Sequence, residues 1–200
     1  VIDSGKASFC LIPRINAAGR VASASDAVRL LLTEDIDEAR LIAQNLDMYN
    51  RKRQAMERNI LNEILEQIER TIDPEKVRSL VFASDKWHPG VIGIVASKLV
   101  DRYCRPTILI SLKDGIGKGS GRSVADFNIY EGLKECDSLL LSYGGHRYAA
   151  GISIKEEDIK EFSGMLEEVI SKEIDVADFV SQTNIDAICN LSDITHELIS

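Results

Sequence analysis

Apolar residues recur with helical spacing through much of the first half of the chain. From Ile36 to Ile72 they follow one another in steps of three, four and, once, seven, which indicates one buried helix face. The face consists of Ala39, Ile42, Leu46, Tyr49, Met56, Ile60, Ile64, Ile68 and Ile72. One helix over this span would be about 50 Å long. We therefore expect it to connect two bodies and to end at Asp73-Pro74.

The long helical pattern is interrupted once, at Arg53, within Asn50-Arg51-Lys52-Arg53-Gln54. Two interpretations remain open: a solvent-exposed gap between two docked halves, or a polar face turned toward a neighbouring domain. We predict that Arg53 faces an inter-domain cleft. Upstream, Ser25 is expected to cap a short helix over Asp26 to Leu32, whereas Val1 to Arg20 has little periodicity.

An α/β pattern begins near Val77. Buried-type strands are expected at 79–84 and 107–112, a glycine-rich strand at 116–123 and a short strand at 151–154. Helices are expected at 91–103, 127–136 and 156–173. The predicted fold class is α/β: a long connecting helix, then a compact α/β domain whose central mixed sheet is flanked by helices.

Composition is that of a soluble globular chain, with 200 residues, 44% hydrophobic and 28% charged. No apolar run reaches the length of a membrane span, and Gly and Pro are too few for low complexity. The start at Val-Ile-Asp is interpreted as a cut inside a longer protein. The four cysteines and three histidines lack zinc-ligand spacing, and unpaired cysteines favour the cytoplasm.

Charge is distributed unevenly along the chain, whose net charge is −8. Residues 86–123 hold seven Lys or Arg and two Asp, whereas residues 154–200 hold three Lys and twelve Asp or Glu. A basic middle segment can bind phosphates locally although the whole chain is acidic. An ordinary solvated surface is the alternative.

Three segments break the local folding rules, which makes them candidates for function. In the first, Trp87 to Ala96, Pro89 suits the first turn of a helix whose free N–H groups would attract an anion. His88 is either a helix cap or a site residue. Gly93 inside this helix is expected to permit the close approach of a strand or loop.

The other two segments are rich in glycine. In Gly117 to Ser123, alternating glycines would let a ligand backbone come close to the donors Ser120, Arg122 and Ser123, unless the segment is a plain bulged hairpin. In Gly144 to Gly151, small residues would present His146 on a cramped loop. Because no carboxylate cluster suits a two-metal site, we interpret the chain as a substrate-binding half.

The order of these motifs resembles that of the RecJ exonucleases, in the DHH phosphoesterase superfamily. The resemblance rests on Leu11-Ile12-Pro13-Arg14-Ile15-Asn16-Ala17-Ala18-Gly19-Arg20, Asn50-x-x-Arg53-Gln54, Trp87-His88-x-Gly90-Val91-Ile92-Gly93-Ile94-Val95-Ala96, Gly119-Ser120-Gly121-Arg122-Ser123 and Gly144-Gly145-His146-x-x-Ala149-Ala150-Gly151. It implies a single-strand-specific 5′→3′ DNA exonuclease that acts in repair and recombination, with single-stranded DNA as its partner and no membrane.

The resemblance also implies a division of the chain. Residues 1–35 would end the DHH catalytic domain, 36–73 form the connecting helix, 74–174 form the DHH-associated substrate-binding domain, and 175–200 begin an OB-like domain. The family's Mn²⁺ or Mg²⁺ ions would be bound upstream. No metal is expected on this chain, which should therefore be inactive alone.

The resemblance and the residues together predict the site. His146 would contact the phosphate or stabilise its developing charge, and substrate would be bound by Ser120, Gly121, Arg122, Ser123, Gly144, Gly145, His88, Gly90, Arg14, Asn16, Arg20 and Arg53. Two alternatives stay open. One is a smaller DHH phosphodiesterase acting on short oligonucleotides or cyclic dinucleotides, and the other is a nucleic-acid-binding module without catalysis.

Overall fold

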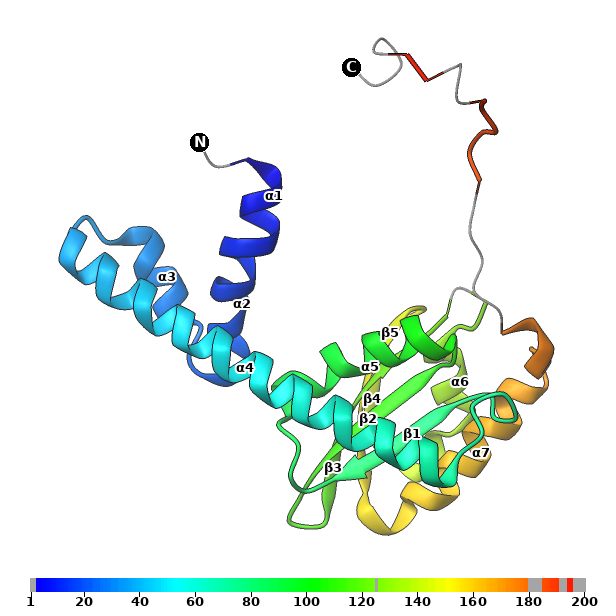
Figure 1. Ribbon diagram of the computed structural model, residues 1–200. Coiled ribbons are helices and arrows are strands. Elements are labelled where there is room, and N and C mark those ends of the chain that lie inside the picture. Colours follow the sequence, from blue (N-terminus) through cyan, green and yellow to red (C-terminus); the bar gives the residue numbers. More distant parts are fainter. Residues whose placement is uncertain (1–2, 125, 180–184, 191–193, 196–200) are drawn as a thin grey trace.

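The computed structural model describes residues 3–124, 126–179, 185–190 and 194–195 (Figure 1). Its N-terminal part is entirely helical. It consists of α1 (Ser4–Lys6), the π-helical turn η1 (Ala7–Leu11), α2 (Ile12–Val21) and α3 (Ser25–Leu32). Of these, α2 and α3 pack against the first half of the long helix α4 (Ile36–Thr71). The sequence pattern did not indicate the helices before Arg20. Ser25 lies inside α3, and Ala24 occupies the N-cap position that we expected Ser25 to take.

Helix α4 confirms the prediction of one continuous helix. The Asp35 carboxylate accepts hydrogen bonds from the backbone N–H groups of Asp37 and Glu38 and so begins the helix. The first half of its apolar face packs on α2 and α3, and the second half packs on the α/β part of the chain. Figure 1 shows α4 running from the helical N-terminal part along the sheet-containing part.

Five strands form one mixed sheet in the order β1-β2-β3-β5-β4. Strands β1 (Leu80–Ser84) and β2 (Thr107–Lys113) are parallel and are joined through helix α5 (Pro89–Tyr103). Strands β3 (Ile116–Arg122), β5 (Ala149–Lys155) and β4 (Leu140–His146) add in antiparallel fashion. A parallel pair needs a crossover helix, whereas the antiparallel strands need only hairpins or short connections.

Each face of the sheet has its own apolar core. Helix α5 and the second half of α4 cover one face at β1 and β2. Helices α6 (Ile129–Glu135) and α7 (Ile159–Ser171) pack on the opposite face. The remaining elements are short 3₁₀ turns: η2 (Asp137–Leu139), η3 (Glu156–Asp158) and η4 (Val176–Asp178). The predicted fold class is therefore confirmed.

The α4–α5 side of the sheet is only partly covered. At β3, β5 and β4 this face carries small or polar side chains, and several of them are exposed. Side chains that alternate along a strand share a face, and directly paired residues of neighbouring strands do too. This face of the sheet presents Lys118, Ser120 and Arg122 of β3, Gly151 and Ser153 of β5, and Ser142, Gly144 and His146 of β4. Helix α5 lies against Ser120 and Arg122, whereas Ser142, Gly144 and His146 are exposed. Among the described residues, no helix has the length and apolar character needed to cross a membrane.

Candidate functional site

Arg122 lies at the end of β3, where the sheet meets helix α5. Its Nη1 group donates hydrogen bonds to Ser120 Oγ at 3.1 Å and to the Gly121 carbonyl oxygen at 2.7 Å. These bonds hold the guanidinium against its own strand. Because Ser120 Oγ acts as acceptor in this pair, its own proton remains available to donate to another group.

A glycine of α5 makes room for this pair. A Cβ atom placed on Gly93 would lie 2.7 Å from Ser120 Oγ and 3.1 Å from Arg122 Nη2. Such contacts are too close, so only glycine allows the strand and its arginine to pack here. This confirms the expectation that Gly93 permits a close approach.

A second arginine approaches from the helical N-terminal part. Arg20, in the last turn of α2, donates from Nη1 to the Gly90 carbonyl oxygen at 3.2 Å. A Cβ atom on Gly90 would lie 2.1 Å from the Arg20 carbonyl oxygen, so Gly90 allows the backbones of α2 and α5 to touch. Gly90 thus docks α2 onto α5, and its role in binding substrate stays a prediction.

Arg20 and Arg122 are close enough to repel each other. Burial, and then the charge of Arg20, lower the pKa of Arg122 below its ordinary value. Within the described part of the chain, neither guanidinium has a carboxylate partner. Two unpaired like charges beside each other are costly, and a bound anion would relieve the repulsion. This pair of arginines is therefore the candidate anion site.

His88 caps helix α5. Its Nδ1 atom accepts a hydrogen bond from the Gly90 N–H at 3.1 Å, and its carbonyl oxygen accepts bonds from Val91 and Ile92. Pro89 has no N–H to offer. The expected free N–H groups at this helix start are therefore occupied, and the helix end does not by itself form the predicted anion site.

The glycines of β3 serve the apolar core. Cβ atoms added to Gly119 and Gly121 would meet Ile152 at 2.5 Å and Ile129 at 2.7 Å, both on the face packed against α6 and α7. The missing side chains thus make room for isoleucines and not for a ligand. The donors Ser120 and Arg122 point to the opposite face of the strand.

His146 belongs to a hairpin and not to a loop. Residues 144–146 are the end of β4, and the turn to β5 contains Arg147 and Tyr148. Gly145 has φ +153°, and a Cβ there would lie 2.3 Å from the Ala149 carbonyl oxygen, so this glycine fits the hairpin. Gly144 faces open space.

Arg122 and His146 lie at the same level of the sheet, on either side of strand β5. Arg122 pairs with Ala149, and Ala149 pairs with His146, so the two residues share a face. Strand β5 separates their backbones by about 10 Å. His146 is exposed, and its Nδ1 accepts a bond from the Tyr148 N–H at 3.3 Å. One phosphate shared by both residues was expected, but this spacing better fits two neighbouring groups of a longer ligand.

Three other predicted residues lie elsewhere or are engaged in structure. The Ser123 hydroxyl donates to the Phe127 carbonyl oxygen at 2.8 Å, so its proton is not available to a phosphate. The Arg14 guanidinium bonds Asp47 at 2.9 Å and the Cys10 carbonyl oxygen at 2.7 Å, within the helical N-terminal part. Asn16 is exposed on α2.

Arg53 is turned away from solvent, but toward its own helix. Its side chain is 14% exposed, and it bonds Glu57 at 2.7 Å and Asn50 Oδ1 at 2.9 Å. Glu57 also pairs with Lys98 of α5 at 2.5 Å. Arg53 therefore belongs to a buried polar contact between α4 and α5, and its contact with substrate stays a prediction. Glu57 and Lys98 were missed because no local pattern pairs residues so far apart in sequence.

A metal site does not fit the described residues. They contain no group of three His, Cys, Asp or Glu side chains positioned to hold a metal ion. We therefore assign no step that depends on Mn²⁺ or Mg²⁺ to these side chains.

Comparison with known proteins gives one domain match. Residues 76–172 match the family model described as DHHA1 domain. These residues contain the whole sheet, α5, Arg122 and His146.

Two kinds of relatives extend the likeness into the helical part. The chain is 41% identical, over 195 residues, to the single-stranded-DNA-specific exonuclease RecJ of Bacillus subtilis, a match that covers 96% of this chain and 24% of that protein. The crystal structure of exonuclease RecJ bound to manganese matches with TM-score 0.79 and 36% identity, over 90% of this chain and 44% of the other. RecJ of Thermus thermophilus in complex with Mn²⁺ matches with TM-score 0.77 and 37% identity, over 86% and 25%. The chain spans about a quarter of the length of the curated relative from Bacillus subtilis.

Proposed function

Because this chain belongs to the RecJ family and contains its DHHA1 domain, we propose that it supplies the nucleic-acid-binding half of a 5′→3′ single-stranded-DNA exonuclease. In this proposal the whole protein hydrolyses phosphodiester bonds in DNA repair and recombination, in the cytoplasm. The RecJ relatives favour it over the smaller phosphodiesterase and over the module without catalysis. The metal ions would be bound by other parts of the protein.

The observation that carries the proposal is the pair of arginines, Arg20 and Arg122. They come from two parts of the chain that are far apart in sequence, and they meet at the partly covered face of the sheet without a carboxylate partner in the described residues. A phosphate placed there would accept hydrogen bonds from both guanidinium groups and from the Ser120 hydroxyl. His146, at the same level and on the same face of the sheet, would contact the DNA strand at a neighbouring nucleotide.

Such a site favours a flexible single strand for a physical reason. The open part of the sheet between β3 and β4 has small side chains, including Gly144 and Gly151, that let a backbone lie close to the surface. A strand that is not paired can bend to place its phosphates against fixed cations, whereas a duplex is stiff on this scale. Contacts of this kind fix position without reading sequence.

The proposal is tested by the binding of a fluorescent single-stranded oligonucleotide to this chain. Arg122→Ala should weaken binding about tenfold to a hundredfold, since a hydrogen bond to a charged group contributes about 1.5–3 kcal/mol. Arg102→Ala, at an exposed position of the last turn of α5, is the control and should change affinity little. Equal affinities for the two variants, with both proteins folded, would contradict the proposal.

A further inference from the structure

A cavity in the described part of the chain lies at the start of α5, and neither arginine of the pair is among its lining residues. Its volume is about 860 Å³, within the range of small-ligand sites. It is formed where the parallel strands β1 and β2 end and α5 begins, which is where open α/β sheets bind ligands. Its lining includes Met56, His88, Lys113, Ile116 and Lys118.

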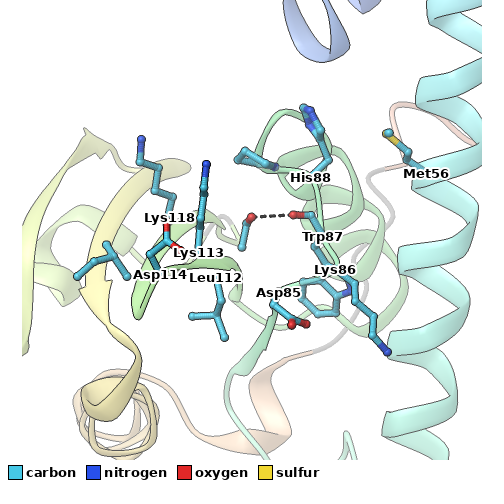
Figure 2. Close-up of a pocket in the computed structure, with 12 residues that line it drawn as sticks. Met56, Asp85, Lys86, Trp87, His88, Leu112, Lys113, Asp114 and Lys118 are labelled. Carbon is cyan, nitrogen blue, oxygen red and sulfur yellow. Dashed lines mark hydrogen bonds between the residues drawn. The ribbon is translucent and has the colours of Figure 1, made fainter.

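Hydrogen-bond donors gather at one end of this cavity. The amines of Lys113 and Lys118 point toward the same end as the His88 ring, whereas the Lys86 amine points the other way (Figure 2). Since His88 Nδ1 accepts from Gly90, a neutral ring carries its proton on Nε2, the nitrogen left to donate. The carboxylates of Asp85 and Asp114 also line the cavity, but no ion pair joins them to the lysines in the described structure.

Part of the lining is apolar. Met56 and Ile116 contribute apolar side chains to the lining, whereas the Leu112 side chain packs against the core on the opposite face of the sheet. The Trp87 carbonyl oxygen is already bonded by the Ser111 hydroxyl at 2.7 Å. An apolar wall beside a cluster of cations suits a ligand that has a flat apolar part and a negative group. A nucleotide has both.

Strand β3 links this cavity to the arginine pair. Lys118, Ser120 and Arg122 alternate along β3 and therefore share one face, with Lys118 about 13 Å from Arg122 along the strand. Helix α5 runs beside them, since Gly93 touches Ser120 and Arg122 while His88 and Lys118 line the same cavity. Lys118, Ser120 and Arg122 thus form one line of hydrogen-bond donors along β3, between α5 and the open part of the sheet.

We propose that this cavity is a second nucleotide subsite. In it, Lys118, with Lys113 and His88, binds one phosphate of a DNA single strand, while Arg122 binds another phosphate of the same DNA strand. The inference rests on the proposed function and adds a direction to it. The DNA strand runs along β3 beside α5, in addition to any contact that it makes across the sheet at His146. The base of the bound nucleotide packs on the apolar side chains of Met56 and Ile116.

The test compares ligands of two lengths. The wild type and two variants, Lys118→Ala and Lys160→Ala, are each titrated with thymidine 5′-monophosphate and with an octathymidylate. Lys160→Ala is the control, because the exposed Lys160 side chain lies on α7, across the sheet from the cavity. Lys118→Ala should weaken octamer binding about fivefold and reduce the slope of log affinity against log salt by about 0.7. It should leave binding of the mononucleotide at Arg122 unchanged, and Lys118→Arg should restore octamer binding.

The outcomes separate the inference from the proposed function. If Arg122→Ala weakens the octamer and Lys118→Ala matches the Lys160→Ala control, the second subsite is overturned and the proposed function stands. If Lys118→Ala weakens the mononucleotide as much as the octamer, the cavity takes a free nucleotide and the strand path is overturned. If Arg122→Ala leaves both ligands unaffected, the proposed function fails and the inference fails with it. Thermal melting of each variant verifies folding.

Discussion

Gly93 illustrates how one missing side chain shapes the site at the scale of single residues. Ser120 and Arg122 pack against the space where its Cβ would lie. Gly93→Ala should therefore displace Arg122 and weaken single-strand binding about tenfold, through loss of a charge-assisted contact. Stability should change by less than about 1 kcal/mol, because alanine's higher helix propensity offsets part of the strain. Oligonucleotide titration and chemical denaturation measure the two effects.

Gly164 provides the matched control for that substitution. It lies in α7, and a Cβ there would meet nothing within 4 Å. Gly164→Ala should raise the free energy of unfolding by about 0.5–1 kcal/mol and leave DNA binding unchanged. Unaltered DNA binding by Gly93→Ala would show that Arg122 does not depend on this contact.

Cys136 gives a prediction about pH. Burial, and then the nearby Glu135 charge, raise the pKa of its thiol from an ordinary value of 9.0 to about 11. Between these values the unfolded chain loses the thiol proton while the folded chain keeps it, so the free energy of unfolding should fall as pH rises. In Cys136→Ala this decrease between pH 9 and 11 should be smaller, as measured by denaturation at each pH. Parallel pH profiles would refute the assignment.

Single residues also show the limits of sequence reasoning. The GSGR pattern correctly pointed to Ser120 and Arg122 as neighbours, but it could not assign the glycines to the core. That assignment depends on Ile129 and Ile152, which reach β3 only through tertiary pairing. Lys118 shares the alternation of Ser120 and Arg122, so its face was readable from the sequence. The cavity beside it was not, because separate segments of the chain form it.

At the scale of elements, the long helix α4 was the most predictable feature. Its apolar period and the Asp35 cap are both local signals. The interruption at Arg53 was visible, but its meaning was not. Asn50 and Glu57 occupy the buried positions there, and Glu57 is neutralised by Arg53 and by Lys98 from α5. The N-terminal helices before Arg20 were missed because their exposed apolar residues, such as Phe9 and Leu11, blur the helical period.

The buried polar contact between α4 and α5 can be tested directly. Glu57→Gln keeps the shape of the side chain but removes the charge that Arg53 and Lys98 share. We expect the free energy of unfolding to fall by about 1–3 kcal/mol. Glu66→Gln, which affects only an exposed pair with Arg70 on the same helix, should cost less than about 0.5 kcal/mol. Similar losses in urea denaturation for both variants would mean that the buried pair has no special role.

At the scale of the whole molecule, this chain is expected to bind DNA without cutting it. The described residues form no metal-binding group, and phosphodiester hydrolysis in the proposed enzyme depends on metal ions. A labelled single strand incubated with this chain and Mn²⁺ should therefore remain intact on a denaturing gel. Progressive shortening of the strand by purified chain, and not by an Arg122→Ala preparation, would contradict the division of labour proposed here.

The central claim is that Arg20 and Arg122, brought together by the docking of α2 on α5, bind one phosphate. A double-mutant cycle measures it most directly, with single-strand affinity determined for the wild type, Arg20→Ala, Arg122→Ala and the double variant. Residues that act on one group are not additive, so we predict a coupling energy of about 0.5–3 kcal/mol. Additive losses within about 0.3–0.5 kcal/mol would show that the two arginines act at separate places and would contradict the account.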